Sequence, residues 1–216
     1  EDGVGWTRPE GRRGACDAKW CVGDGAAQWE VRRSRTVGAR SGECSNGETF
    51  TAGQLAPVDA HADFRNEYMG SKFSHACTAR RISEICPIVE VGVRSVSEEE
   101  MDFINKHNVP VYFNDLSFNT IPQSAEDILA SLTDNVYVSI DLDVLDPSLM
   151  PGVGTPEPGG MLWWETLRIL RAVSERRRIV GFDLMELAPS EGPEACAYTA
   201  AKLAYKLMAY ATARPG

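Results

Sequence analysis

The sequence predicts an α/β fold in which a mostly parallel sheet is covered by helices on both faces. From residue 55 onward, short segments rich in β-branched residues alternate with longer segments of helical periodicity. Strands that alternate with helices form parallel sheets with helices on the two faces. The composition is that of a globular protein, with 43% hydrophobic and 25% charged residues, and the length of 216 residues suits a single domain.

The strands and helices follow in a regular order. β-branched and aromatic residues predict strands at residues 87–94, 109–113, 135–141 and 179–186. Helical spacing predicts helices at residues 97–107, 125–132, 161–176 and 194–210. The first helix begins with a capping box, Ser97 and Glu100, which satisfies amide groups that a helix start leaves free. A further strand at residues 54–58 is expected to be degraded, because Pro57 lacks the amide hydrogen that a central strand donates.

The first part of the chain differs from the rest. Residues 1–54 contain no Leu, Ile or Met, but they hold ten of the 19 glycines and seven arginines. A segment so poor in aliphatic residues buries too little surface to offset the entropy of ordering it. We therefore expect an irregular or disordered segment at 1–54, followed by an α/β domain at 55–216. One hypothesis is that residues 1–54 are not the native N-terminal half.

Charge and composition exclude several classes of function. The formal net charge of -9 argues against nucleic acid as a partner, and it suits either a cationic ligand or a soluble acidic surface. No apolar run approaches the roughly 20 residues of a membrane span. The six cysteines are scattered without a C-x-x-C pair, which predicts reduced thiols in the cytoplasm and argues against structural zinc.

Two clusters of potential metal ligands follow strand-like segments. Asp59, His61 and Asp63 alternate with alanines, so in an extended chain they point to one side. Asp141 and Asp143 share a side where an apolar strand ends. Carboxylates brought together repel one another unless a cation neutralises them, and oxygen ligands with an imidazole suit Mn²⁺. The alternative for either cluster alone is a turn, a helix cap or a solvated loop.

Three motifs then resemble one known family. Residues 59–76 read DAHADFRNEYMGSKFSHA, residues 139–160 read SIDLDVLDPSLMPGVGTPEPGG, and residues 183–189 read DLMELAP. In this order they resemble the metal-binding segments of the ureohydrolase (arginase/agmatinase) family, and most closely its agmatinase members. The resemblance covers the chain from about residue 58 to its end.

The resemblance implies a three-layer α/β/α sandwich (the arginase-like fold), assembled as a homo-oligomer, either a trimer or a hexamer. It also implies a binuclear manganese site. Its ligands would be Asp59, His61, Asp63, Asp141 and Asp143, with Asp59 and Asp141 shared by the two ions. A hydroxide held between two divalent ions would attack the guanidinium carbon. Asp63 would hydrogen-bond that hydroxide.

The resemblance implies two further catalytic residues. His75 would carry a proton to the leaving amine, and Glu186 would hold the cationic guanidinium group. Without the resemblance, both would be interpreted as surface residues. The implied reaction converts agmatine and water to putrescine and urea, a step of polyamine biosynthesis, with arginine or guanidinobutyrate as alternative substrates.

One departure from the family pattern bears on activity. The family supplies a further metal histidine from an upstream segment, whereas residues 1–60 contain no histidine. We therefore expect one of the two metal sites to be incomplete. The alternative function is a truncated or catalytically impaired homologue that serves as a subunit or binding protein. A third hypothesis, a haloacid-dehalogenase-type phosphatase using Asp141 and Asp143, leaves the first acidic cluster unexplained.

Overall fold

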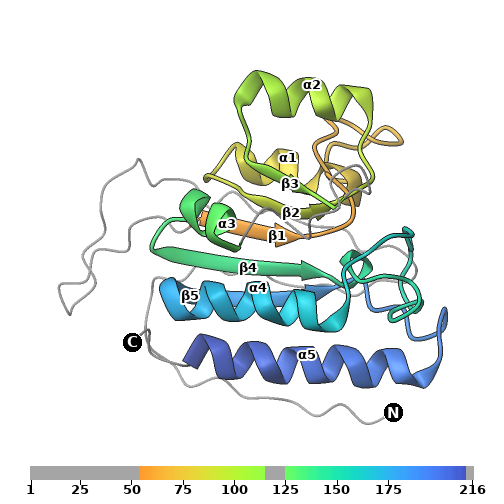
Figure 1. Cartoon of the computed structure of the whole chain (residues 1–216). Helices are drawn as coiled ribbons and strands as arrows, with labels where there is room; N and C mark the ends of the chain where they lie inside the picture. Colours follow the sequence, from red (N-terminus) through yellow and green to blue (C-terminus); the bar gives the residue numbers. More distant parts are fainter. Residues whose placement is uncertain (1–53, 115–124, 213–216) are drawn as a thin grey trace, which may run out of the picture.

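The computed structural model describes residues 54–114 and 125–212, in which five parallel strands form one sheet (Figure 1). The strands lie in the order β3-β2-β1-β4-β5. They are β1 (Gln54–Val58), β2 (Glu90–Val93), β3 (Val111–Phe113), β4 (Asn135–Asp141) and β5 (Arg178–Met185). The α-helices are α1 (Thr78–Ser83), α2 (Glu98–His107), α3 (Ala125–Ser131), α4 (Trp163–Arg176) and α5 (Glu194–Thr212), and the 3-10 helices near the strand ends are η1 (His75–Cys77) and η3 (Leu142–Val144). The irregular segment expected at 1–54 lies outside the described residues, except for Gln54.

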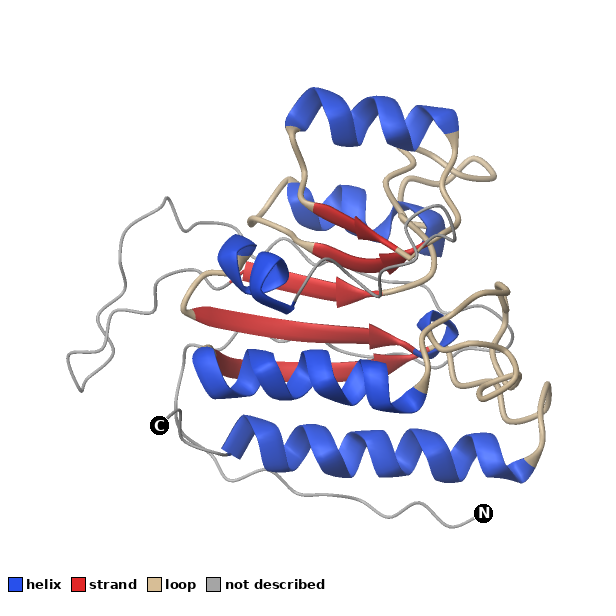
Figure 2. Cartoon of the chain, in the orientation of Figure 1, coloured by secondary structure: helices blue, strands red, loops and turns tan. Residues whose placement is uncertain are grey.

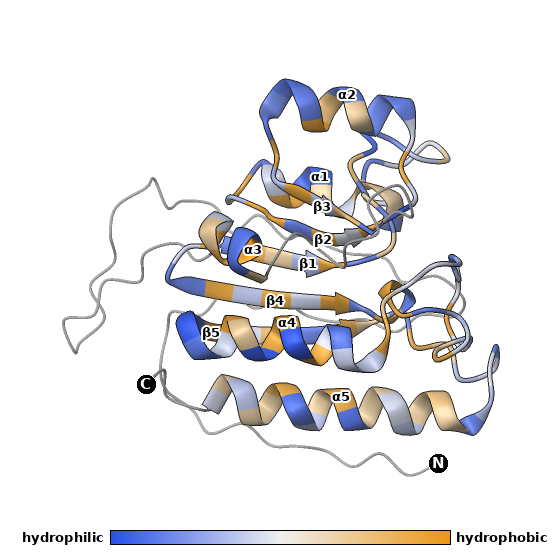
Figure 3. Ribbon diagram, in the orientation of Figure 1, coloured by the Kyte–Doolittle hydropathy of each residue, from blue (hydrophilic) through white to orange (hydrophobic). Residues whose placement is uncertain are grey.

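Helices cover both faces of the sheet, so the fold is the predicted three-layer α/β/α sandwich (Figure 2). On one face, α3, α4 and α5 pack against the strands through a buried apolar cluster that includes Ile128, Leu170, Leu203, Val91 and Val138. On the other face, α1 and α2 pack through a second cluster that includes Ala79, Ile104, Ile88 and Val93. Hydrophobic residues accordingly lie in the strands and along stripes of α4 and α5 (Figure 3).

The strand expected to be degraded is the central strand of the sheet. β1 pairs with β4 along its whole length, with Pro57 opposite Ser139. Successive backbone N–H groups of a strand point to opposite neighbours. The N–H groups of Leu55 and Asp59 donate to carbonyls of the segment that contains β2, at 3.1 and 3.0 Å. The missing N–H of Pro57 therefore faces β2, and β1 loses one bond to one neighbour while its pairing with β4 stays intact.

The other predicted elements form with shifted ends. The strand predicted at 87–94 contracts to Glu90–Val93, and the helix predicted at 194–210 extends to Thr212. The capping box at α2 is present, since Glu100 Oε2 accepts hydrogen bonds from Ser97 N and Ser97 Oγ at 2.8 and 2.7 Å. The short helices η1 and α1 were not predicted from the sequence.

The fold gathers the candidate residues at one edge of the sheet. The carboxyl ends of parallel strands meet at the same edge, which is where ligands bind in open α/β sheets. Asp59 directly follows β1, Asp141 ends β4, and Glu186 directly follows β5. Among the described residues, no helix is both long and apolar enough to cross a membrane.

Candidate metal centre

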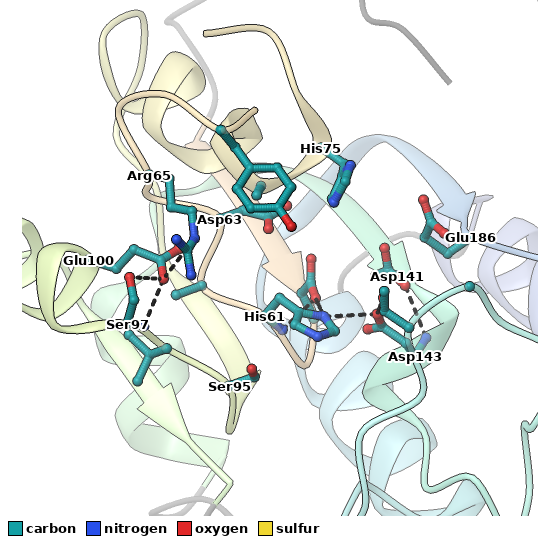
Figure 4. A pocket seen from close by; sticks show the side chains of 17 residues that line it. His61, Asp63, Arg65, His75, Ser95, Ser97, Glu100, Asp141, Asp143 and Glu186 are labelled. Carbon is teal, nitrogen blue, oxygen red and sulfur yellow. Dashed lines mark hydrogen bonds and ion pairs between the residues drawn. The ribbon is translucent and has the colours of Figure 1, made fainter. Parts of the chain in front are cut away.

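Two neighbouring strands, β1 and β4, bring the two acidic clusters together. Asp59 and His61 lie just after β1, and Asp143 lies in η3 just after β4. The Nδ1 atom of His61 is 2.9 Å from Asp143 Oδ2 and 3.7 Å from Asp59 Oδ1 (Figure 4). One potential ligand atom from each of the three residues lies within 4.8 Å of the other two. Residues more than 80 positions apart in the sequence thus converge on one point, as the strand-end argument predicts.

Backbone hydrogen bonds fix these carboxylates. Asp59 Oδ1 accepts from the His61 amide at 2.7 Å, and Asp143 Oδ1 accepts from the Ala60 amide at 3.2 Å. Asp141 Oδ1 accepts from the Asp143 amide at 3.0 Å, which caps η3. The hydroxyl of Thr155 donates to Asp143 Oδ2 at 3.2 Å. Side chains held in this way are preorganised for a ligand, because little rotamer freedom remains to be lost on binding.

The three clustered groups have displaced pKa values in the absence of a cation. Burial, partly opposed by the hydrogen bond with His61, raises the pKa of Asp59 to about 6. Hydrogen bonds with Asp143 and then Asp59 raise the pKa of His61 to about 10. Burial would raise the pKa of Asp143 as well, but the hydrogen bond and the charge of His61 outweigh it and lower that pKa. The partly exposed His61 and the buried Asp143 therefore form an ion pair in the metal-free chain.

All seven residues predicted for the site line one cavity of about 440 Å³, namely Asp59, His61, Asp63, His75, Asp141, Asp143 and Glu186. Asp63 and Asp141 lie outside the closely clustered trio. Burial, together with the charge of Asp59, raises the pKa of both carboxyl groups well above the ordinary value. A bound cation would oppose these shifts, because it favours the ionised form of a nearby carboxyl group.

The donor chemistry of the cluster fits a divalent cation. Carboxylate oxygens with one imidazole nitrogen are ligands that Mn²⁺ and similar ions accept, and no thiol takes part among the described residues. The negative charge gathered at this edge, buried and incompletely paired, is the arrangement that a cation would stabilise. The residues present therefore fit a metal ion, and the cluster of Asp59, His61 and Asp143 could supply three ligands from two strand ends.

His75 and Glu186 reach the cavity from two other segments. His75 begins η1, its side chain is exposed, and its Nδ1 lies 3.5 Å from Ser74 Oγ. The ring of Tyr68 contacts the His75 ring edge-on, with 5.6 Å between the ring centroids. Glu186 has a φ of 62°, a left-handed conformation that turns the chain as it leaves β5. Figure 4 shows both side chains pointing into the space above Asp141.

Sequence reasoning missed residues that support the cluster from outside. The Arg94 guanidinium donates to the Asp143 and Glu157 carbonyls at 2.7 and 2.6 Å, which ties the end of β2 to η3 and to the loop after it. Thr155 lies in the second motif, residues 139–160, but the motif alone indicates no role for it. The only sequence signal for either residue is its position after a strand or inside a motif. Neither the carbonyl partners of Arg94 nor the Asp143 partner of Thr155 can be identified from the sequence.

Comparison with known proteins gives one consistent family. The family model described as the arginase family matches residues 52–210. The chain is 42% identical over 166 residues to an N(1)-aminopropylagmatine ureohydrolase of Synechocystis sp., which covers 76% of this chain and 53% of that protein. It is also 42% identical over 149 residues to an agmatinase of Pyrococcus horikoshii, covering 68% of this chain and 51% of that protein.

Solved structures give the same result. The agmatine ureohydrolase of Thermoplasma volcanium is similar with a TM-score of 0.65 and 36% identity, over 73% of this chain and 54% of that chain. The chain thus spans about half the length of the relatives that it matches.

Proposed function

The chain belongs to the arginase family, and from this premise we propose that it hydrolyses a cationic guanidino compound, converting agmatine and water to putrescine and urea. The observation that carries the proposal is the meeting of Asp59, His61 and Asp143 at the carboxyl edge of the sheet, with ligand atoms within 4.8 Å of one another. The match to family members named agmatinase supports the reaction class.

We propose two Mn²⁺ ions as the cofactor. Asp59, His61, Asp63, Asp141 and Asp143 would hold them, and all five line the cavity. When bound, a pair of divalent ions lowers the pKa of shared water, so that a nucleophile exists near neutral pH. The cluster of buried carboxylates supports this assignment, because it needs positive charge to be stable when ionised.

The remaining roles belong to side chains around the cavity. The Glu186 carboxylate would accept charge-assisted hydrogen bonds from the guanidinium group and hold its carbon over the cluster. Asp63 would accept a hydrogen bond from the attacking water. As the carbon–oxygen bond forms and the bond from carbon to the leaving nitrogen breaks, His75 would donate a proton to that nitrogen. The amine leaves as putrescine, and the carbon leaves as urea.

N(1)-aminopropylagmatine is the second candidate substrate. Two relatives at 42% identity, from Synechocystis sp. and Thermococcus kodakarensis, carry that name. Arginine and guanidinobutyrate differ from agmatine at the end of the molecule away from the guanidinium group. They therefore also test how the site distinguishes that end of the substrate.

A catalytically impaired homologue, acting as a subunit or binding protein of a homo-oligomer in the cytoplasm, is the alternative function. One observation favours it, because residues 1–60 contain no histidine that could act as a further metal ligand. In that case the cluster would bind metal without producing urea.

Urea release separates these proposals. The purified chain is loaded with Mn²⁺ and assayed with agmatine, N(1)-aminopropylagmatine, arginine and guanidinobutyrate, with a His75→Ala variant as the control. Release from agmatine supports the first proposal, and preferential release from the aminopropyl compound supports the second substrate. No release from any of the four, with manganese bound, favours the impaired homologue.

A further inference from the structure

Glu90, in β2, is a buried acid without a partner. Glu90 is 1% exposed, and neither of its carboxyl oxygens has a hydrogen-bond partner among the described residues. Buried polar side chains are nearly always hydrogen-bonded, to protein or to ordered water. Glu90 is not one of the residues for which the motifs or the proposed chemistry provide a role. An unpaired carboxyl group at this depth therefore points to something bound beside it.

The alternation of side chains along β2 places Glu90 on the face of the sheet that α1 and α2 cover. Val89 and Val91 point into the cluster packed by α3, α4 and α5. Glu90 points to the opposite face, with Ile88, which belongs to the cluster beneath α1 and α2. There, Pro57 of the neighbouring strand offers no side-chain donor or acceptor.

Glu90 lines a second, smaller cavity, which shares Asp59, Asp63 and Asp141 with the first. This cavity measures about 60 Å³, and its walls include Glu90, Asp59, Asp63, Asp141 and Ser139. On this measure a water molecule needs roughly 10–15 Å³ and two to four polar neighbours. The cavity is therefore both large enough and polar enough to hold more than one water molecule.

We propose that Glu90 is a positioning residue of the metal centre, which holds ordered water in this cavity and, through that water, orients the carboxylates of Asp59 and Asp63. A water molecule has two protons to donate. One would go to Glu90, and the other would go to a carboxylate oxygen that is turned away from the ions. This inference rests on the proposed metal centre and extends it to a residue outside the ligand set.

Such partners of metal ligands are energetically important. They fix the orientation of a ligand, and their loss typically lowers metal affinity by about 10- to 100-fold. The alternative is that Glu90 is only a destabilising buried acid. Both interpretations predict that an apolar residue of similar size would stabilise the metal-free fold. Only the positioning role predicts weaker Mn²⁺ binding as well, because the substitution removes the acceptor that holds the water.

The test uses Glu90→Leu and Glu90→Gln in the full chain. Mn²⁺ affinity is measured by titration calorimetry, and thermal unfolding is measured in excess EDTA. We expect E90L to unfold at a higher temperature than wild type in EDTA, yet to bind Mn²⁺ about 10- to 100-fold more weakly. E90Q keeps an acceptor oxygen of the same reach, so we expect its Mn²⁺ affinity to remain that of wild type.

Each other outcome overturns a definite part of the inference. Unchanged Mn²⁺ affinity in E90L would show that Glu90 does not position the ligands. Equal weakening in E90L and E90Q would show that the negative charge, rather than a held water, is what matters. A wild-type chain that binds no Mn²⁺ would overturn the metal centre itself, and this inference with it.

Discussion

Asp141 is the residue at which β4 ends, and its carboxylate serves both the backbone and the proposed metal. Its Oδ1 accepts from the Asp143 amide at 3.0 Å. Asparagine at this position keeps that acceptor and loses only the charge. We therefore predict that Asp141→Asn folds like wild type and retains less manganese after dialysis, as measured by elemental analysis.

Asp146→Asn is the matched control for this prediction. Asp146 lies in the same segment, but its carboxylate caps the loop by accepting from Ser148, Gly159 and Gly160 amides, and it does not line the cavity. Manganese content equal to wild type in both variants would remove Asp141 from the ligand set.

His61 gives the metal affinity a pH dependence of known sign. The hydrogen bond with Asp143 raises the pKa of His61 to about 10, so the metal-free chain holds this proton at neutral pH. A ring nitrogen must lose its proton to bind a metal ion. Mn²⁺ affinity should therefore rise with pH, by up to about tenfold per unit from this group.

The experiment is calorimetric titration with Mn²⁺ between about pH 6.5 and 8.5, in buffers of different ionisation enthalpy, which counts the protons released. The stability of the metal-free fold has the opposite dependence. The contribution of His61 is fully present below its ordinary pKa of 6.5, and it is lost as the pH rises through about 10. Affinity independent of pH, with no proton released, would contradict the assignment of His61 as a ligand.

At the scale of elements, the close approach of β2 to the metal cluster depends on Gly92. Its φ is 100°, and a Cβ atom there would lie 2.4 Å from Val144 Cγ2 and 3.2 Å from the Asp59 carbonyl. We predict that Gly92→Ala destabilises the fold, because it strains the backbone and forces η3 away from β2.

Gly70→Ala separates these two effects. Gly70 also has a positive φ, of 79°, but no atom lies within 4 Å of the position its Cβ would take. The variants thus share backbone strain and differ in crowding. We expect urea denaturation to show G92A roughly 1–3 kcal/mol less stable than G70A. Equal stability of G92A and G70A would mean that η3 moves away from the added Cβ atom at no cost in folding free energy.

The elements also show what the sequence could and could not predict. The alternation of strands and helices, and the acids at strand ends, were enough to predict a parallel sheet with one functional edge. Pro57 was misleading, because a rule about central strands does not say which neighbour the missing amide faces. The position of Glu90 beside a cavity could not be predicted for a related reason, since a cavity arises only when several elements pack. The proposed metal ligands lie in short sequence motifs, whereas the residues that support them come from distant segments of the chain.

At the scale of the whole molecule, a bound metal ion would strengthen the link between two parts of the sheet that the ion pair of His61 with Asp143 already joins. Asp59 and His61 leave from β1, and Asp143 leaves from η3 after β4, so a bound ion links the two segments only in the folded chain. A ligand that binds the folded state alone stabilises it by mass action, by about 2.7 kcal/mol at a free concentration 100 times its Kd. For a chain of this size, each kcal/mol raises the melting temperature by roughly 2–4 °C.

We therefore predict that Mn²⁺ at such a concentration raises the melting temperature of the wild-type chain by roughly 5–11 °C over EDTA, as measured by differential scanning calorimetry. Asp143→Asn should abolish most of this rise, because it removes the negative charge of a proposed metal ligand. The Asp143 carboxylate also contacts the first cluster, through His61 and the Ala60 amide. Asp183→Asn is the control, since Asp183 accepts from Tyr137 and Ser139 on β4 and lines neither cavity. A rise of the same size in D143N and D183N would mean that Mn²⁺ binds somewhere other than this edge of the sheet.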